Sequence, residues 1–374
     1  MKKIYKIIIV LLIVIVAVTV FWQSNNNHKK QVNNPIKIGA ILSLTGVAAD
    51  FGDMSQKAIK LAVEEINQNG GIDGRLVELY IEDDQTTPQT AISAYQKLNS
   101  INHADAIVGG LFDFTAQPLF PIAEQNKKVF ISPVNFQIDN SFEMNKYSFV
   151  MYPKFSKVIS ELDSVIKDKN VKHLGMIRYK SSFGESIQST LSQIMQNKGE
   201  LTVETYSTIG SSDFRTNILK LKDKNLDSVF LDMLDFDIVK YISIAESLQF
   251  KPQVIAYTTL RDVFNNPKVD KSKLEGAIMI DWEVPSDEFI KRFESKYGEK
   301  PRRGANKSYD AVYVLAEAIA KANTEDGVAT YLEKNSFTTV NGKTAFDESH
   351  AVENTPINIY QIVNGEMEVV KSVR

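Results

Sequence analysis

The stretch that decides the fold runs from Ile36 to Asp84 and reads IKIGAILSLTGVAADFGDMSQKAIKLAVEEINQNGGIDGRLVELYIEDD. Its beginning, Ile36–Ser43, is rich in apolar and β-branched residues and predicts a buried strand. A helix is predicted over Met54–Asn67, because apolar residues recur there every three or four positions. Gly70-Gly71 ends this helix, since glycine adopts the left-handed conformation without a Cβ penalty. A second strand, LVELYIEDD, follows, and a strand–helix–strand order predicts parallel pairing.

The same alternation continues along the rest of the chain. Thr87-Pro88 predicts the start of the next helix, with threonine as N-cap and proline at the first helical position. A strand within Tyr147–Phe155 is expected to carry the chain from one lobe to another, and alternation resumes after it. Near the end of the chain, Asn364-Gly365 stands between two alternating runs and predicts a type I′ hairpin. We therefore predict an α/β fold with two doubly wound parallel-sheet lobes.

Composition excludes several classes of function. The chain has 374 residues, which is long enough for two domains, and a formal net charge of −3. A chain without excess positive charge offers nucleic acid little electrostatic attraction, so no nucleic-acid partner is predicted. Cysteine is absent, which excludes disulfides, thiolate metal ligands and a cysteine nucleophile.

The first 34 residues read as a separate segment that targets the chain to the membrane. Six residues that include three lysines precede an unbroken apolar run, Ile7–Trp22, and an asparagine-rich tether follows. As a helix the run would span roughly 24 Å, longer than a usual cleavable signal core and somewhat short of a bilayer core. Phe21 and Trp22 stand where a peptidase needs small side chains, which favours an uncleaved apolar helix as an anchor over a cleaved export signal. The lysines predict a cytoplasmic N-terminus, with the remaining chain outside the cytoplasmic membrane.

Signatures of catalysis are missing from the sequence. GxSxG, HExxH, GxxxxGK[ST], GxGxxG and EF-hand patterns do not occur. No histidine has a partner at metal-ligand spacing, and all four are expected at the surface or in loops: His28, His103, His173 and His350. We interpret Asp83-Asp84 as a solvated strand end with a turn-forming aspartate rather than a paired-carboxylate site. The pair Arg302-Arg303 is interpreted as part of a solvated face.

Aromatic and polar residues gather where the predicted strands end. In open α/β sheets, ligands bind at the carboxyl ends of the strands. The predicted loops at those ends contain Phe51, Leu111, Phe112, Asp113, Asn135, Phe136, Phe183, Asp232, Asp235, Thr258 and Thr259. Aromatic walls with a few polar groups are typical of a pocket for a small molecule. A single phenylalanine could equally be a core residue, and the recurrence in both halves favours the pocket.

Several long motifs resemble one known family. They include the opening stretch from KIGAILS through EINQNGGIDGR to DDQTTPQTA, and AIVGGLFDFTAQP, YKSSFGES and SYDAVYVLAEAI further on. The chain from Ile36 to the C-terminus resembles the leucine/isoleucine/valine-binding proteins, the type I periplasmic binding proteins of ABC importers. The resemblance implies two lobes joined by crossover strands, with a solute bound between them by hinge closure. It places lobe 1 at 36–151 plus 284–335, and lobe 2 at 152–283 plus 336–374.

The resemblance also implies roles for individual residues. Phe51 and Phe183 match aromatic walls, and Tyr309 matches a tyrosine of the hinge region. The positions that hold a ligand α-carboxylate in amino-acid-binding members fall on Asp113 and Phe136, and the position that holds the ammonium falls near Thr258 or Thr259. Tyr309 is also expected to contribute to ligand binding.

Asp113 conflicts with the family's usual way of binding an amino acid. A carboxylate there would repel a ligand carboxylate unless it were protonated or paired. Asp113 could therefore face a ligand donor or cation, or cap a helix that begins near Thr115, or do both. On the lobe 2 side, Asp232 and Asp235 add negative charge where an amine would be favoured.

The sequence thus predicts a solute-binding protein of an ABC-type importer, located outside the cytoplasm, and not an enzyme. Its predicted ligand is an amino acid, amide or amine with an apolar body. Its predicted partners are that solute, the ABC permease subunits and, through the N-terminal segment, the membrane; no cofactor or metal is implied. The alternative is a membrane-anchored sensing ectodomain that signals to a partner.

Overall fold

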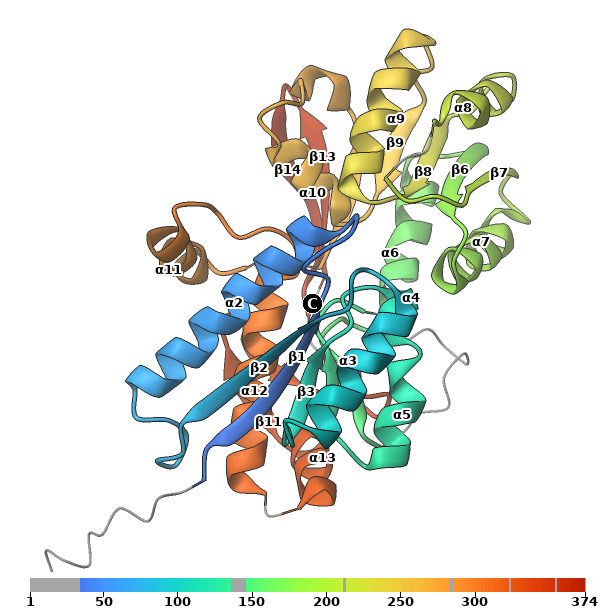
Figure 1. The fold of residues 1–374 in the computed structure, drawn as a ribbon. Coiled ribbons are helices and arrows are strands. Elements are labelled where there is room, and N and C mark those ends of the chain that lie inside the picture. The colour runs from blue at the N-terminus through green and yellow to red at the C-terminus, as the bar shows by residue number, and fades with distance from the viewer. Residues whose placement is uncertain are drawn as a thin grey trace, which may run out of the picture.

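Two mainly parallel sheets organise the chain in the computed structural model, which describes residues 34–135, 146–210, 213–282, 285–322, 324–353 and 355–373 (Figure 1). In the described part of the chain, the lobe 1 sheet has five parallel strands in the order β2-β1-β3-β4-β5. These strands are β1 Ile36–Leu42, β2 Val77–Asp83, β3 Ala106–Gly109, β4 Phe130–Ser132 and β5 Ser148–Val150. The opening stretch therefore forms the predicted parallel unit, with Ile36 opposite Val77.

Helices cover both faces of the lobe 1 sheet. One face carries α2 and α12, which pack against each other, and the other carries α3, α4 and α5 (Figure 1). Their bounds are α2 Ala49–Gln68, α3 Pro88–Ser100, α4 Asp113–Ala116, α5 Leu119–Asn126 and α12 Ala305–Lys321. Two further helices complete this lobe, α11 Asp287–Tyr297 and α13 Glu325–Lys334. This doubly wound arrangement confirms the predicted fold class for the lobe.

Local signals explain most helix boundaries. Thr87 caps α3 by accepting a hydrogen bond from the amide of Thr90 at 3.2 Å, with Pro88 at the first position, as predicted. The predicted start of α2 at Met54 was five residues late. The helix begins at Ala49 without a side-chain cap, so the sequence carries no start signal there. Gly52 lets the first turn press against β1, since a Cβ at this position would lie 1.9 Å from the carbonyl oxygen of Ser43.

The lobe 2 sheet has the order β14-β13-β10-β9-β8-β6-β7 within the described residues. Its parallel strands are β6 His173–Tyr179, β7 Glu200–Tyr206, β8 Ser228–Asp232, β9 Gln253–Ala256 and β10 Ile278–Asp281. Two antiparallel strands, β13 Ile357–Val363 and β14 Glu366–Val373, extend one edge. They form the predicted hairpin, and Asn364 and Gly365 both have the positive φ that a type I′ turn requires, 53° and 74°.

Helices again lie on both faces of the lobe 2 sheet. The lobe 2 sheet has an apolar core on each face. One core includes residues of α6 and α7, and the other includes residues of α8, α9 and α10. Their bounds are α6 Phe155–Asp168, α7 Ser182–Met195, α8 Arg215–Lys222, α9 Asp235–Ser247 and α10 Thr259–Asn265. A short 3-10 helix, Lys271–Leu274, leads into β10. The predicted second doubly wound lobe is therefore present.

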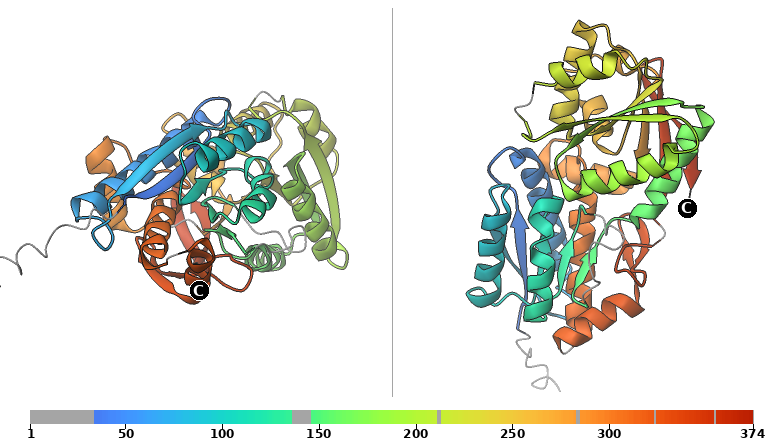
Figure 2. Two further views of the ribbon diagram at one scale, coloured as in Figure 1. Left: turned by 60° about the horizontal axis from the view of Figure 1, so that its bottom comes forward. Right: turned by 90° about the vertical axis from the view of Figure 1, so that its right-hand side faces the viewer.

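The structure corrects one predicted boundary of lobe 2. Residues 336–374 were assigned to it as a whole, but β11 Ser336–Thr339 and β12 Gly342–Ala345 form a separate hairpin against α12 of lobe 1. Phe337 and Phe346 are buried in the lobe 1 core, and the ring of Phe346 lies 5.0 Å from that of Phe149. In the right-hand view of Figure 2, the red C-terminal hairpin lies with the upper lobe, whereas α12 and α13 lie with the lower one. Because these two phenylalanines are buried in lobe 1, the C-terminal part of lobe 2 begins near residue 355 rather than at residue 336.

The predicted apolar anchor, Ile7–Trp22, lies outside the described residues. Among the helices that the structure does describe, none combines the length and apolar character needed to cross a bilayer.

Candidate ligand-binding site

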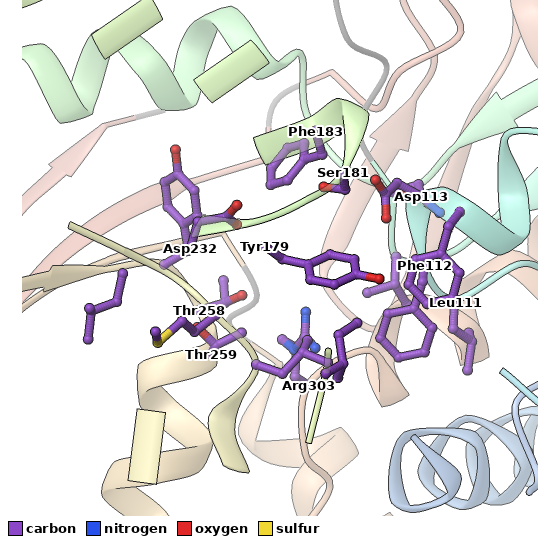
Figure 3. A pocket seen from close by; sticks show the side chains of 18 of the residues that line it. Leu111, Phe112, Asp113, Tyr179, Ser181, Phe183, Asp232, Thr258, Thr259 and Arg303 are labelled. Atoms are coloured by element: carbon purple, nitrogen blue, oxygen red, sulfur yellow. The ribbon is translucent and has the colours of Figure 1, made fainter. Parts of the chain in front are cut away.

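A cavity of about 130 Å³ lies between the two lobes. A single water molecule needs roughly 10–15 Å³ by this kind of measure, so the cavity has room for a small organic molecule. Both lobes contribute to its walls (Figure 3). Of the predicted site residues, those that line the cavity are Leu111, Phe112, Asp113, Asn135, Phe183, Asp232, Thr258 and Thr259.

Three of the other predicted residues lie outside this lining, and the fourth cannot be placed. Phe51 lies behind the wall, with its ring edge-on to Phe112 at 5.9 Å. Asp235 is in the first turn of α9. Tyr309 is buried within lobe 1, where its hydroxyl bonds Glu65. Phe136 falls outside the described residues.

The lobe 1 wall is the loop that follows β3. Gly109 and Gly110 both have positive φ, and a Cβ on Gly109 would lie 2.1 Å from the carbonyl oxygen of Ile41, so the loop leaves the sheet in a way that only glycine permits. The side-chain amide of Asn135 donates to the carbonyl of Gly110 at 2.9 Å and thus fixes the loop. Phe112 stacks on Phe114 with ring centroids 5.4 Å apart, which makes this wall a rigid aromatic surface.

Asp113 turns toward the other lobe. It is the first residue of α4, and the N-cap position belongs to Phe112, so the predicted capping role of Asp113 was wrong by one position. Its carboxylate accepts hydrogen bonds from the Ser181 hydroxyl and the backbone amide of Phe183, at the start of α7, and from the amide of Phe114. Burial raises the pKa of the Asp113 carboxyl, and these hydrogen bonds oppose the rise. Figure 3 shows Asp113 facing Ser181 across the cavity edge.

Asp232 stands on the lobe 2 wall at the end of β8. Its Oδ2 is inaccessible to solvent and has no hydrogen-bond partner among the described residues. Burial raises the pKa of this carboxyl to about 7, the charge of Asp113 adds to the rise, and Arg178 opposes it. A buried carboxylate oxygen without a partner is costly, so this group is poised for a donor or a cation.

Aromatic residues that the predicted site omitted complete the lobe 2 wall. Tyr179 and Tyr206 are the last residues of β6 and β7, and Tyr152 and Trp282 belong to the crossovers between lobes. The indole of Trp282 lies edge-on to Tyr257, 5.4 Å between ring centroids. The Tyr257 hydroxyl is buried without a hydrogen-bond partner in the described structure, and burial followed by the charge of Asp232 raises its pKa well above the usual range. Tyr179 and Tyr206 could have been identified from the sequence, because each stands at the carboxyl end of a predicted strand.

Arg303 corrects the interpretation of the arginine pair as a solvated face. Arg302 is exposed as expected, but the Arg303 side chain is only 12% exposed and lines the cavity. Its guanidinium lies over the ring of Phe51 at 4.5 Å, and its Nε is 3.8 Å from Oδ2 of Asp262 in α10. Arg303 therefore links lobe 1 to lobe 2 beside the predicted binding loop.

The remaining candidate groups have structural roles. Asp83 accepts hydrogen bonds from the amides of Leu44 and Gln85, at 2.9 and 2.8 Å, and thus shapes the turn after β2. His350 lies in a loop, but it is buried: its ring stacks on Phe149 at 4.2 Å, and its Nδ1 donates to the carbonyl of Ser148. In the part of the chain that the structure describes, no group of acidic and histidine side chains could hold a metal ion.

Comparison with curated proteins gives relatives of nearly the same length. A Leu/Ile/Val-binding protein homolog of Brucella suis is 24% identical over 363 residues, which cover 90% of this chain and 91% of the relative. The leucine-, isoleucine-, valine-, threonine- and alanine-binding protein of Pseudomonas aeruginosa is also 24% identical, over 87% of this chain and 89% of its own.

Solved structures share the fold. The LivJ branched-chain amino acid binding protein of Streptococcus pneumoniae, in complex with isoleucine, has a TM-score of 0.78 at 24% identity, over 91% of this chain and 99% of that one. A Rhodopseudomonas palustris solute-binding protein in complex with 3,4-dihydroxybenzoic acid has a TM-score of 0.80 at 18% identity, over 91% and 97%. The family model described as periplasmic binding protein matches residues 35–366. The chain therefore belongs to the periplasmic binding protein family, as its resemblance to the leucine/isoleucine/valine-binding proteins indicated.

Proposed function

We propose that this protein is a solute-binding protein of an ABC-type importer, and that it binds an amino acid or a related small amine or amide between its lobes. Membership of the periplasmic binding protein family implies a location outside the cytoplasm. The curated relatives are named as binding proteins rather than as enzymes. The observation that carries the ligand class is the Asp232 carboxylate, which lines an aromatic cavity and has an oxygen without a hydrogen-bond partner in the described structure.

Different parts of the cavity wall would contact different parts of the ligand. A ligand ammonium or amide N–H would meet Asp232, with the Tyr257 hydroxyl beside it. The apolar body of the ligand would lie against aromatic rings of both lobes, including Phe112 and Phe183. Because ligand contacts come from both lobes, binding favours the closed arrangement over an open one, and closure is the event that a permease pair would read.

A second function uses the same cavity. The predicted apolar segment Ile7–Trp22 would tether the lobes to the membrane. A tethered protein of this kind could report its ligand to a signalling partner instead of delivering it to a permease. Reconstitution decides between the two functions: solute uptake into vesicles that contain an ABC permease and its ATPase, with this protein added, supports import, whereas ligand-dependent signalling without uptake supports the second function.

Calorimetric titration tests the ligand class directly. The full chain, purified in mild detergent, is titrated with a panel of amino acids, their amides and amines. We expect binding of at least one solute that carries an ammonium or amide donor, and a loss of affinity of at least tenfold in Asp232→Asn. Asp223→Asn is the matched control, because it removes the same charge from an exposed site in the same lobe. Best binding by a solute that lacks any donor would contradict the proposal.

A further inference from the structure

The charged groups around the cavity are predominantly acidic. Four carboxyl groups are involved: Asp113 and Asp232 line the cavity, and Asp235 and Asp262 lie immediately behind its wall near Arg303. Three cations accompany them: Arg303 in the lining, Arg178 beside Asp232, and the exposed Arg302, whose charge also acts on Asp235. With all seven groups ionised, they have an excess of one negative charge.

Arg303 and Arg178 both lie beside polar or charged groups of the protein, but only Arg178 is hydrogen-bonded to them through its guanidinium in the contacts that follow. Arg303 lies close to Asp262, with its Nε 3.8 Å from Oδ2, and its charge also opposes the rise in pKa that burial imposes on Asp235. Arg178 donates to Oε1 of Gln188 at 2.6 Å and to the carbonyl of Tyr179 at 3.3 Å. The Arg178 guanidinium is therefore not a ready partner for a ligand carboxylate. Nε and one Nη of Arg303 make no hydrogen bond among the described residues, and a ligand carboxylate at this guanidinium would face the charges of Asp262 and Asp235.

The helix terminus that faces the cavity is also occupied. An N-terminus such as that of α7 is a favourable place for an anion, because its free amides and its dipole attract negative charge. Here Asp113, from the opposite lobe, accepts hydrogen bonds from Ser181 and from the amide of Phe183. Asp232 flanks the same turn, since a Cβ on Gly184 would lie 2.8 Å from its Oδ2. Asp113 thus occupies donors that could hold a ligand carboxylate, and Asp232 adds a second carboxyl group beside them.

Aromatic side chains surround the acidic groups. Tyr179, Tyr206 and Tyr257 on lobe 2, with Phe112 on lobe 1, line the cavity. Aromatic faces attract cations, and they also bind apolar surface. A zwitterion would bring a carboxylate into this acidic setting and would leave its charge excess unchanged, whereas a net cation would reduce it.

We propose that the preferred ligand is a net cation without a free carboxylate: an amine or amino-acid amide with an apolar or aromatic body. This inference rests on the proposed function and narrows its ligand class. The ammonium is held by Asp232, the aromatic rings enclose the body, and Asp113 excludes the parent amino acid by charge repulsion and by occupying the donors of α7.

Matched ligands test the proposal by calorimetric titration of the full chain. Leucine, leucinamide and 3-methylbutylamine share one side chain and one ammonium, and only leucine carries a carboxylate. Phenylalanine, phenylalaninamide and 2-phenylethylamine form a second, aromatic set. In at least one set, the amide and the amine are expected to bind at least tenfold more tightly than the amino acid.

The two ways to fail are distinguishable. Leucine or phenylalanine binding as tightly as its carboxylate-free partners overturns this inference and leaves the proposed function standing. If no solute of the wider panel of amino acids, amides and amines binds, the proposed function fails and the inference fails with it.

A charge variant tests the role of Asp113 separately. Asp113→Asn keeps an oxygen that accepts hydrogen bonds but removes the negative charge, so the preference for amine over amino acid should fall at least fivefold. Asp223→Asn should leave that preference unchanged. Circular dichroism of both variants checks the fold, and Asp232→Asn provides a second measurement, a loss of amine affinity of at least tenfold. An unchanged preference in a folded Asp113→Asn protein contradicts the role given to Asp113.

Discussion

The carboxylate of Asp113 in lobe 1 accepts a hydrogen bond from the backbone amide of Phe183 in lobe 2. This contact joins the loop after β3 to the first turn of α7, directly beside the ligand cavity. The lobes are therefore linked at their facing edges by a side chain of the protein, in addition to any contact that a ligand makes.

Removing this link should open the ligand-free protein. Hydrogen bonds to charged groups contribute roughly 1.5–3 kcal/mol, so Asp113→Ala is expected to shift the equilibrium toward the open form by about tenfold or more. Small-angle scattering without ligand should then show a larger radius of gyration than for the natural protein. Asp113→Asn, which retains an acceptor, should lie between the two, and identical scattering from all three proteins would contradict a linking role.

Ligand affinity should depend on pH through Asp232. Its pKa is raised to about 7, so the carboxyl is largely ionised at pH 8 and largely protonated at pH 6. The ammonium of an amine ligand keeps its charge over this range, so affinity should fall by about tenfold from pH 8 to pH 6. Of the groups that act on Asp232, Arg178 and Tyr257 keep their charge states, whereas Asp113 also has a raised pKa and adds to the same trend. Titrations at both pH values check this, with Asp232→Asn expected to keep only the part of the pH dependence that Asp113 contributes, and equal affinities of the natural protein at pH 8 and pH 6 would contradict it.

Gly184 should be sensitive to a single added methyl group. A Cβ there would lie 2.5 Å from the carbonyl oxygen of Tyr179 and 2.8 Å from Oδ2 of Asp232. Gly184→Ala must therefore displace Asp232 or the start of α7, and we expect a loss of ligand affinity of roughly tenfold and a destabilisation of about 1–3 kcal/mol. Ser189→Ala, at an exposed position of the same helix, is the control and should change neither quantity appreciably. Equal behaviour of the two alanine variants in titration and urea unfolding would show that the close contact of Gly184 with Tyr179 and Asp232 contributes neither to ligand affinity nor to stability.

The two neighbouring arginines should differ sharply in their contribution to stability. Arg303→Ala removes the guanidinium whose Nε lies 3.8 Å from the buried Asp262 carboxyl, and breaking a buried ion pair from one side costs on the order of 3–5 kcal/mol. Arg302→Ala removes an exposed side chain and should change the free energy of unfolding by less than about 0.5 kcal/mol. Urea unfolding measures both values. Similar values for the two variants would restore the interpretation of the pair as a solvated face.

Local patterns account for the parts of the fold that could be predicted. Each of these parts is encoded by residues that are close together in the sequence. Examples are the strand–helix–strand unit of the opening stretch, the cap at Thr87 and the turn at Asn364-Gly365. The position of Leu111, Phe112 and Asp113 at the cavity also follows from a general rule, because parallel strands present their carboxyl ends at one edge.

The rest of the site depends on residues that are distant in the sequence. Trp282 reaches the cavity because a crossover passes there, and Arg303 is buried because Asp262 is beside it. The partners of Asp113 are about 70 residues away, at Ser181 and Phe183, so no local pattern reveals them. The β11–β12 turn consists of Val340 and Asn341, and only the following Gly342, the first residue of β12, has a positive φ, so this turn lacks the Asn-Gly signal of the C-terminal hairpin.

The link from Asp113 to α7 has a consequence for import, if the protein delivers its ligand to a permease as proposed. A protein whose halves hold each other without cargo would display nearly the same outline when vacant as when loaded. A permease that recognised only the closed conformation would then also bind ligand-free protein. Import would slow as the excess of ligand-free over ligand-bound protein grew, because both forms would compete for the permease. In vesicles, adding surplus protein at a fixed amount of cargo should accordingly lower the rate of uptake, and Asp113→Ala should relieve that inhibition.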